Sequence, residues 1–339
     1  MRAAVLHEPM PVERGPLVLE ERPIPEPPKG HVLLRVRACG VCRTDLHIVE
    51  GELPPHRSPL VPGHQIVGEV LRCGEGASLR EGSRVGVSWL GGTDGTCPFC
   101  TAGEENLCDA PIFTGYDVDG GYAEYAVVRA DFVHELPAAL DDRHAAPLLC
   151  AGIIGFRALR VAGVRPGERV GLYGFGASAH LALPVLRAWG CKIFVSTRGE
   201  RHRAFAQRMG ATWVGGPLER PRVALDRAVT FAPAGDVVVA ALGALRKGGV
   251  VAINAIHLDR MPEFDYDSLL WGERQIRSVA NMTRQDARDF LALAAEIELS
   301  AETTVFPLER ANEALAAVKS DALDGAAVLT IDDDAGRAG

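Results

Sequence analysis

The segment 169–197 constrains the fold more than any other part of this 339-residue chain. A short apolar run, 169–173, leads into the glycine-rich sequence Gly-Phe-Gly-Ala-Ser-Ala at 174–179, and a helical stretch at 181–189 is followed by a second apolar run at 192–197. A strand, a Gly-x-Gly-x-x-Ala loop, a helix and a second strand, in this order, are typical of a dinucleotide-binding unit. The segment therefore predicts a parallel, doubly wound sheet with a nucleotide site at the loop.

Three small residues carry the expected nucleotide chemistry. Gly174 allows the tight turn, and Gly176 lets a pyrophosphate approach the backbone closely. Ala179 lets the helix pack tightly on the sheet, and the helix N-terminus faces the phosphates. We expect all three residues to contact or shape the cofactor site.

The end of the second predicted strand bears on the choice of cofactor. In NAD-specific domains an acidic residue at this position accepts hydrogen bonds from the adenosine ribose. Here the position is held by Thr197, which is followed by Arg198 and, close behind, by Arg201 and Arg203. Because a hydroxyl and guanidinium groups can bind a 2′-phosphate, the sequence favours NADP(H), with NAD(H) as the alternative. The other interpretation is that these arginines form a solvated helix face.

Further apolar runs are expected to extend this sheet. They are 227–231, 237–240, 250–254 and 276–280. The first half of the chain differs, since short strands are punctuated there by Pro and Gly. In the run 32–37, apolar Val32, Leu34 and Val36 alternate with other residues, which predicts one buried strand face.

That strand leads into the stretch 39–64, which is rich in metal-binding side chains. Thiol and imidazole ligands suit zinc, and a zinc that keeps one position open for substrate needs three protein ligands. The candidates are one of Cys39 and Cys42, together with His64 and the distant Cys150. The alternatives are buried structural cysteines or a redox pair formed by the Cys-x-x-Cys sequence.

A second cluster lies between residues 94 and 108. Cys97, Cys100 and Cys108 sit on a Gly-rich loop, and Asp94 precedes Cys97 by the same interval that separates Cys97 from Cys100. A carboxylate oxygen can ligate zinc, so these four residues predict a closed structural zinc site. The alternative is a reduced loop without metal.

Composition excludes several classes of protein. The net charge of −8 argues against a nucleic-acid or anionic membrane surface. The apolar run at the N-terminus is too short for a signal peptide, and no apolar run is expected to span a membrane. Eight cysteines without a secretion signal suggest reduced thiols, so we expect a cytoplasmic protein.

With these motifs the chain resembles the zinc-dependent alcohol dehydrogenases of the medium-chain dehydrogenase/reductase superfamily, and most of all their bacterial cinnamyl-alcohol-dehydrogenase-like group. The resemblance covers essentially the whole chain, and its motifs occur in family order at 42–47, 63–64, 97–108, 120–125 and 146–152. It implies an α/β protein with a GroES-like β-rich catalytic domain, 1–150 completed by 282–339, and a Rossmann domain, 151–281. By the same analogy the protein forms a homo-oligomer, a dimer or tetramer.

The resemblance also assigns roles to residues. It selects Cys42 rather than Cys39 as the zinc ligand. Thr44 resembles the hydroxyl that contacts the bound alcohol, and His47 the far end of a proton relay. Asp45 resembles the carboxylate that orients His64.

Four further positions concern the substrate pocket and the metal. Trp89 resembles a bulky pocket wall, and Ile112 and Phe113 add apolar character suited to aliphatic or aromatic primary alcohols. Gln65 departs from the family glutamate that follows the ligand histidine, and we expect turnover to persist without that carboxylate.

The implied activity is the zinc-dependent interconversion of small alcohols with aldehydes or ketones, by hydride transfer with a nicotinamide cofactor and two zinc ions per chain. One alternative is a zinc-independent quinone or enone reductase on the same fold, which would lack the zinc ligands. Another is a nucleotide-binding zinc protein without turnover.

Overall fold

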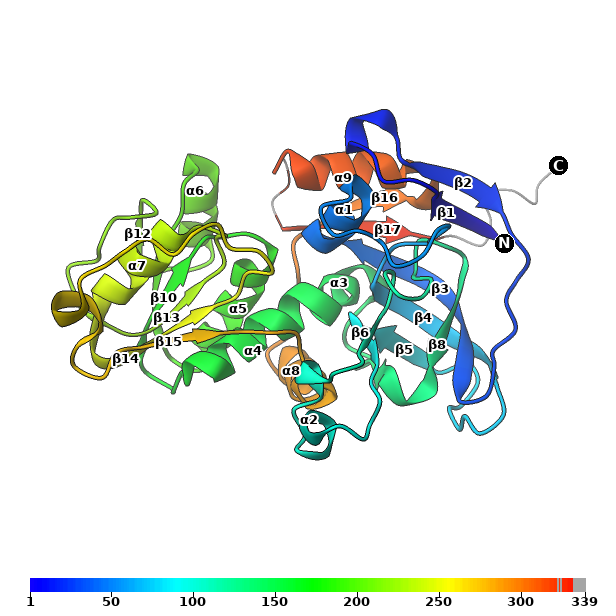
Figure 1. Ribbon diagram of the computed structural model, residues 1–339, viewed down its shortest axis with the longest axis horizontal. Helices are drawn as coiled ribbons and strands as arrows, with labels where there is room; N and C mark the ends of the chain where they lie inside the picture. Colours follow the sequence, from blue (N-terminus) through cyan, green and yellow to red (C-terminus); the bar gives the residue numbers. More distant parts are fainter. Residues whose placement is uncertain (322, 324, 332–339) are drawn as a thin grey trace. The chain divides into compact units, whose positions relative to one another are not determined.

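The computed structural model describes residues 1–321, 323 and 325–331 (Figure 1). The chain divides into two compact units. One comprises Met1–Cys150 and Thr283–Gly339, and the other comprises Ala151–Met282. Met282 thus belongs to the second unit, one residue beyond the expected boundary.

A mostly antiparallel sheet organises the first unit. Within the described part of the chain it has seven strands in the order β16-β17-β3-β4-β5-β9, and β8 pairs with β3 outside this path. Only the β16–β17 pair is parallel. The strands are β3 (His31–Val41), β4 (Gln65–Cys73), β5 (Arg84–Val87), β8 (Tyr125–Arg129), β9 (Val133–Glu135), β16 (Thr303–Pro307) and β17 (Ala326–Thr330).

The long strand β3 carries the core of this unit and leads directly to the candidate metal ligands. Val32, Leu34 and Val36 are all buried, as their alternation predicted, and Leu33 is buried as well. Because β3 pairs with β4, β8 and β17, it has neighbours along both edges. It therefore forms a rigid base for the helix that follows it.

Short elements surround this sheet. Two small antiparallel pairs are formed by β1 (Arg2–Leu6) with β2 (Leu17–Glu21) and by β6 (Leu90–Gly92) with β7 (Ile112–Phe113). The α-helices are α1 (Arg43–Glu50), α2 (Pro98–Thr101), α3 (Asp142–Pro147), α8 (Arg284–Glu296) and α9 (Ala311–Lys319), and single 3-10 turns are η1 (Val12–Arg14), η2 (Glu105–Leu107), η3 (Ala130–Phe132) and η6 (Leu308–Arg310).

The second unit contains the predicted parallel sheet. Its described strands run in the order β12-β11-β10-β13-β14-β15, and every pair is parallel. Counted from β10, this is the order 3-2-1-4-5-6 of a doubly wound dinucleotide-binding domain. The strands are β10 (Arg169–Tyr173), β11 (Lys192–Ser196), β12 (Trp213–Gly215), β13 (Leu225–Thr230), β14 (Leu245–Ile253) and β15 (Gln275–Ser278).

Helices cover this sheet, and one of them corrects a prediction. The run 237–240, which we expected to be a strand, lies inside helix α7 (Gly235–Ala244). The run contains no polar residue, and for a short, mostly buried apolar run periodicity alone does not distinguish a helix from a strand. The other helices are α4 (Ile153–Ala162), α5 (Ala177–Ala188), α6 (Glu200–Arg208) and the π-helical turn η5 (Tyr266–Leu270).

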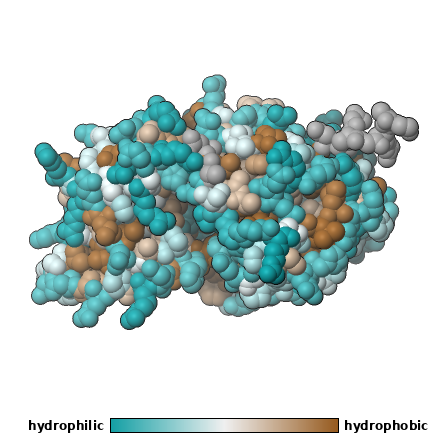
Figure 2. Space-filling model, turned by 90° about the horizontal axis from the view of Figure 1, so that it is seen from above, coloured by the Kyte–Doolittle hydropathy of each residue, from teal (hydrophilic) through white to brown (hydrophobic). Residues whose placement is uncertain are grey.

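One helical stretch bears on the expectation that no apolar run would be long enough to span a membrane. From Asp142 to Ala162 the chain is helical, and it is long and apolar enough by length and composition to cross a membrane. Its most apolar window is 72% buried in the structure, as in a core helix. On the face drawn in Figure 2, hydrophobic residues form separate patches among hydrophilic ones.

Candidate active site

Helix α1 brings three of the predicted site residues together at its first turn. Cys42 is the N-cap, and its backbone N–H donates to Asp45 Oδ2 at 2.9 Å. In return, Cys42 Sγ accepts a hydrogen bond from Thr44 N–H at 3.3 Å. A capping box of this kind satisfies free N–H groups at the helix start, so the cap itself fixes the thiol and the carboxylate.

His64 is positioned by a loop that packs directly on the segment before it. Gly120 N–H donates to Val61 O at 2.7 Å, and Gly121 N–H donates to Gly63 O at 2.8 Å. A Cβ on Gly120 would lie only 2.0 Å from Gly63 O, so this approach requires glycine. The motif at 120–125 therefore acts by holding the backbone next to His64.

The three predicted ligands of the catalytic zinc converge. The ligand atoms of Cys42, His64 and Cys150 all lie within 4.8 Å of one another, and Cys42 Sγ is 3.4 Å from His64 Nε2. Tetrahedral zinc, with bonds of about 2.3 Å to sulfur and about 2.0 Å to nitrogen, would hold such atoms about 3.5 Å apart. The spacing therefore fits this metal.

Asp45 determines which nitrogen of His64 faces the thiols. Its Oδ1 lies 3.0 Å from His64 Nδ1, and both side chains are buried. Nδ1 therefore carries a hydrogen toward the carboxylate, so Nε2 is the nitrogen that faces Cys42 and that a metal would use. This is the arrangement in which a carboxylate orients a metal-binding imidazole.

The electrostatics of this cluster favour a cation. Contact with Cys150, together with burial, raises the pKa of the Cys42 thiol well above its ordinary value. Burial would lower the pKa of His64, but Asp45 and Cys42 raise it well above the usual range. Since zinc binds thiolate and neutral imidazole, it would replace the protons that these groups otherwise keep.

Cys150 lies in an unusual turn of the chain. Pro147, at the end of α3, has no N–H to donate, and the π-helical turn η4 (Leu148–Gly152) follows at once. Wide turns of this type are frequent at functional sites because they redirect side chains. Here the turn contains the third ligand.

Thr44 and His47 share one face of α1. Thr44 is buried, whereas His47 is partly exposed and its Nδ1 pairs with Glu52. Residues three apart on a helix are neighbours, so the two side chains connect the interior next to Cys42 with the surface.

An aromatic stack lies beside His64. The ring of Trp89 contacts His64 edge-on, with centroids 5.0 Å apart, and stacks on Phe113 at 4.8 Å. Ile112, the neighbour of Phe113 in β7, instead lies against Gly92. Phe113 rather than Ile112 therefore extends the wall that Trp89 forms.

The second predicted metal cluster also converges. The ligand atoms of Asp94, Cys97, Cys100 and Cys108 lie within 4.8 Å of one another. Cys97 caps helix α2 and accepts from Cys100 N–H at 3.5 Å, and Cys108 Sγ accepts from Ala110 N–H at 3.4 Å. Backbone N–H groups directed at sulfur stabilise thiolates, as a zinc site requires.

The protonation of this cluster is consistent with metal binding. Hydrogen bonds from the backbone N–H groups of Cys97 and Thr96 lower the pKa of Asp94. Backbone hydrogen bonds also lower the pKa of Cys97, whereas burial raises the pKa of Cys100 to about 11. Asp94 is therefore available as a charged fourth ligand.

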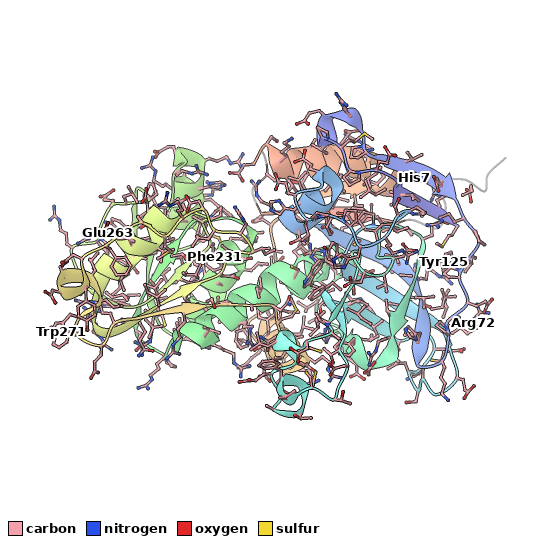
Figure 3. The ribbon with its side chains drawn as sticks, viewed as in Figure 1. His7, Arg72, Tyr125, Phe231, Glu263 and Trp271 are labelled. Carbon is pink, nitrogen blue, oxygen red and sulfur yellow. The ribbon has the colours of Figure 1, made fainter. Side chains whose placement is uncertain are left out.

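In the second unit, the glycine-rich loop connects β10 to α5. Gly174 has φ +90°, which favours glycine, and a Cβ there would lie 3.0 Å from Ala232 N. Gly176 is the N-cap of α5 and has nothing within 4 Å of its Cβ position. Figure 3 labels Phe231, which follows β13 and donates its N–H to Tyr173 O at 2.7 Å. The open side of Gly176 and the free N–H groups of the helix leave room for a phosphate.

The remaining predicted cofactor residues lie in α5, just after β11 and in α6. Ala179 is fully buried in α5, and Thr197 is buried at the end of β11. Arg198 is exposed, and its guanidinium has no hydrogen-bond or ion-pair partner among the described residues. Arg203 pairs with Glu200 at 3.2 Å and donates to the Arg198 carbonyl at 3.4 Å. Of the two arginines, Arg198 is the one free to meet a ligand.

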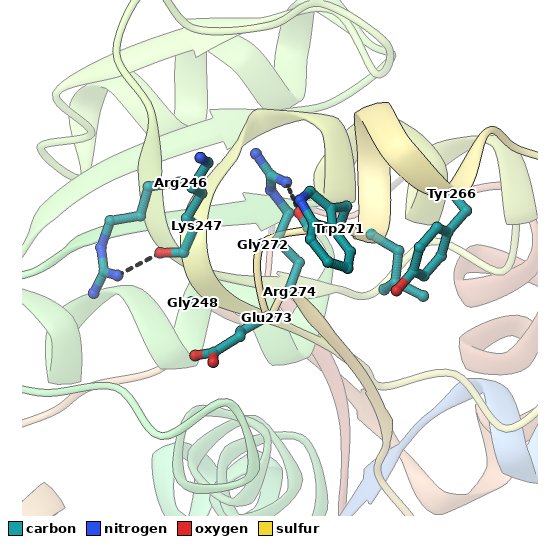
Figure 4. Close-up of a pocket in the computed structure, with 9 residues that line it drawn as sticks. Arg246, Lys247, Gly248, Tyr266, Trp271, Gly272, Glu273 and Arg274 are labelled. Atoms are coloured by element: carbon teal, nitrogen blue, oxygen red, sulfur yellow. Dashed lines mark hydrogen bonds between the residues drawn. The ribbon is translucent and has the colours of Figure 1, made fainter.

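A separate pocket of about 850 Å³ lies elsewhere in the second unit (Figure 4). None of the predicted site residues lines it. Two of its arginines donate to backbone carbonyls, Arg246 to Lys247 O at 2.7 Å and Arg274 to Trp271 O.

Sequence reasoning missed the residues that support the aromatic stack. Tyr116 stacks on Trp89, with centroids 5.9 Å apart, and bonds to His56. Asp117 contacts both His56 and the backbone of Phe113. These residues belong to no recognisable motif, and only their tertiary contacts in the structure identify them.

A mixed cysteine and histidine cluster next to a buried carboxylate, on a chain that also contains a doubly wound sheet, defines the class of zinc-type dehydrogenases. The alcohol dehydrogenase GroES-like domain model matches residues 28–138. The chain is 47% identical to the probable alcohol dehydrogenase AdhA of Mycobacterium tuberculosis (strain CDC 1551 / Oshkosh), over 98% of this chain and 97% of that protein.

Solved structures agree with this relationship. A cinnamyl alcohol dehydrogenase from Sorghum bicolor (SbCAD4) has a TM-score of 0.87 and 25% identity, covering 96% of this chain and 97% of that one. A cobalt- and zinc-bound thermostable alcohol dehydrogenase from Pyrobaculum aerophilum has a TM-score of 0.86 and 26% identity, covering 97% and 99%. The chain belongs to the zinc-type alcohol dehydrogenase family of the medium-chain superfamily, and it is an oxidoreductase that interconverts alcohols and carbonyl compounds.

Proposed function

We propose that Cys42, His64 and Cys150 hold a catalytic zinc and that this zinc makes the protein an NAD(P)-dependent alcohol dehydrogenase for small alcohols and aldehydes. The observation that carries the proposal is the convergence of three ligand atoms within 4.8 Å, with His64 Nδ1 bonded to Asp45. A zinc-independent reductase would have no use for this set. The cobalt- and zinc-bound relative supports the choice of metal.

When bound, zinc acts as a Lewis acid on the alcohol oxygen, and the nicotinamide accepts a hydride from the carbinol carbon. In the oxidising direction the alcohol also loses its hydroxyl proton, so the products are a carbonyl compound, the reduced cofactor and one proton. Thr44, which is buried beside Cys42, is placed to relay that proton, because its hydroxyl can take up the proton of the alcohol while releasing its own toward the surface. His47 donates Nδ1–H to Glu52, which leaves Nε2 to receive a proton near the surface.

The cofactor is proposed to bind at the loop between β10 and α5. Its pyrophosphate would approach Gly174 and Gly176, because the latter has open space where a side chain would otherwise lie. Thr197 and Arg198 favour NADP(H), since no acidic residue stands at the end of β11 to repel a 2′-phosphate. NAD(H) remains the alternative.

We further propose that Asp94, Cys97, Cys100 and Cys108 hold a second, structural zinc. Four protein ligands close a site, whereas three leave a position open for substrate. A homo-oligomer, dimer or tetramer, and a cytoplasmic location complete the proposal by analogy with the family.

The test is a panel of primary alcohols and aldehydes assayed with both cofactors, before and after removal of zinc by a chelator. We expect turnover that is lost with the metal and restored by zinc, but not by magnesium. Full turnover in metal-free protein would contradict the proposal and favour the zinc-independent reductase.

A further inference from the structure

The aromatic stack beside His64 is supported by a hydrogen-bonded trio that the proposed chemistry does not use. The trio consists of His56, Tyr116 and Asp117, and all its contacts lie within the first unit. His56 belongs to the loop between α1 and β4, whereas Tyr116 and Asp117 belong to the turn after β7.

Asp117 binds two partners at once. Its Oδ2 accepts from Phe113 N–H at 2.7 Å, and its Oδ1 lies 2.6 Å from His56 Nδ1. Asp117 N–H also donates to Phe113 O at 2.9 Å. The carboxylate therefore fixes both the turn that carries Phe113 and the ring of His56.

Tyr116 completes the connection. Its hydroxyl lies 2.9 Å from Pro54 O and 3.0 Å from His56 Nε2, and the rings of Tyr116 and His56 are 4.3 Å apart. The Tyr116 ring also stacks on Trp89. Tyr116 is 5% exposed, whereas the His56 side chain is 62% exposed, so a surface loop is tied to a buried ring.

The wall next to His64 thus depends on the loop that follows α1. Trp89 stacks on Phe113, which Asp117 holds, and on Tyr116, which the loop holds. If the trio opened, Trp89 would lose one of its fixed neighbours, and the aromatic stack beside His64 would no longer be held in place.

We propose that Tyr116, held by His56 and Asp117, is a specificity-determining positioning residue that keeps the Trp89–Phe113 stack flat and fixed beside His64. The inference rests on the proposed function of that site. A fixed aromatic face favours substrates with a planar ring next to the carbinol carbon, because stacking then costs no reordering of the wall. A small alcohol that does not contact the aromatic stack gains no binding energy from it.

The experiment compares Tyr116→Phe with the parent in the zinc-loaded, full-length enzyme. Benzyl alcohol and ethanol are the probes, and binding of benzyl alcohol is also followed by tryptophan fluorescence. The phenylalanine ring keeps the stack on Trp89 but removes both hydroxyl contacts. We expect KM for benzyl alcohol to rise about tenfold, as for the loss of a buried hydrogen bond, with kcat and the ethanol parameters unchanged.

Two neighbouring positions sharpen the test. His56→Ala should reproduce the effect, and His56→Gln should restore part of it because the amide can still donate to Tyr116. Arg57→Ala is the matched control, since Arg57 is the next residue in the same exposed loop and pairs only loosely with Asp119, at 3.8 Å. It should behave like the parent.

The outcomes distinguish the positioning role of Tyr116 from the proposed function of the site. Tyr116→Phe would overturn the positioning role if its KM rose equally for benzyl alcohol and ethanol, or if its KM for benzyl alcohol did not change. If the parent binds benzyl alcohol but turns over neither alcohol with either cofactor, the proposed function fails, and weaker benzyl alcohol binding by Tyr116→Phe alone would still support the positioning role.

Discussion

Asp45 Oδ1 lies 3.0 Å from His64 Nδ1, in a position where neither side chain is exposed to solvent. The same carboxylate caps α1 through the N–H of Cys42. One side chain therefore orients two of the three proposed zinc ligands, so we expect zinc affinity to be sensitive to its replacement.

Replacing Asp45 with asparagine should weaken zinc binding more than it harms the fold. The amide keeps the shape but not the charge that orients His64, and losses of this kind typically reduce metal affinity about 10- to 100-fold. Competition with a chelator measures the effect. Asp226→Asn, which removes a carboxylate paired with Arg169 and Arg246 in the second unit, should leave zinc affinity unchanged. Equal zinc affinity in Asp45→Asn and the parent would refute the orienting role.

Much of the metal chemistry could be predicted from the sequence because ligand spacing is local. The four residues between Asp94 and Cys108 lie on one loop, so their convergence needs little tertiary information. The set of Cys42, His64 and Cys150 spans more than a hundred residues, and there the resemblance to a family was needed to choose Cys42 over Cys39.

Other features depended on tertiary contacts that no local pattern encodes. Helix α7 was mistaken for a strand because the short apolar run 237–240 contains no polar residue that would reveal a helical period. The trio of His56, Tyr116 and Asp117 joins two loops whose sequences show no shared signal. The parallel sheet around β10, by contrast, was predicted from the glycine-rich loop between two apolar runs, whereas the order of its strands comes from the structure.

Glu105 and Arg284 should make stability depend on pH. Arg284 donates to both carboxylate oxygens of Glu105, and one of these bonds is 2.6 Å long. Burial would raise the pKa of Glu105, but the bonds from Arg284 hold it below its ordinary value. Such a carboxyl stabilises the fold above its unfolded-state pKa, about 4.3, and this contribution is lost as the pH falls through the folded-state pKa.

We therefore expect Glu105→Gln to reduce the free energy of unfolding by about 1–2 kcal/mol at pH 7, with a smaller difference near pH 4. Urea unfolding at a series of pH values measures this. Glu313→Gln, which removes an exposed pair with Arg310, should change little. If the difference in the free energy of unfolding between Glu105→Gln and the parent grew toward acid pH, it would contradict this prediction.

Gly176→Ala separates folding from cofactor binding. Nothing lies within 4 Å of the Cβ position, so the fold should tolerate the methyl group. The pyrophosphate needs that space, and we expect cofactor affinity to fall about tenfold or more. Fluorescence titration with NADPH and thermal unfolding together test both statements. An unchanged Kd would place the pyrophosphate elsewhere.

Arg198→Ala tests the cofactor preference. The side chain is exposed and unengaged among the described residues, so its loss should not disturb the fold. One charge-assisted hydrogen bond to a 2′-phosphate is equivalent to roughly ten- to hundredfold in kcat/KM for NADPH over NADH. Arg208→Ala, further along α6, is the control. A parent that prefers NADH, or a preference for NADPH untouched by Arg198→Ala, would show that this arginine does not read the phosphate.

The metal content of three proteins, measured alongside alcohol oxidation, tests the central claim most directly. The parent should contain about two zinc ions per chain, since each of the two clusters has a complete ligand set. Cys150→Ser should lose the catalytic zinc and nearly all turnover. Cys100→Ser should lose the other zinc, and its stability should fall before its activity does. If Cys150→Ser loses a zinc but keeps full activity, then Cys42, His64 and Cys150 do not form the catalytic centre.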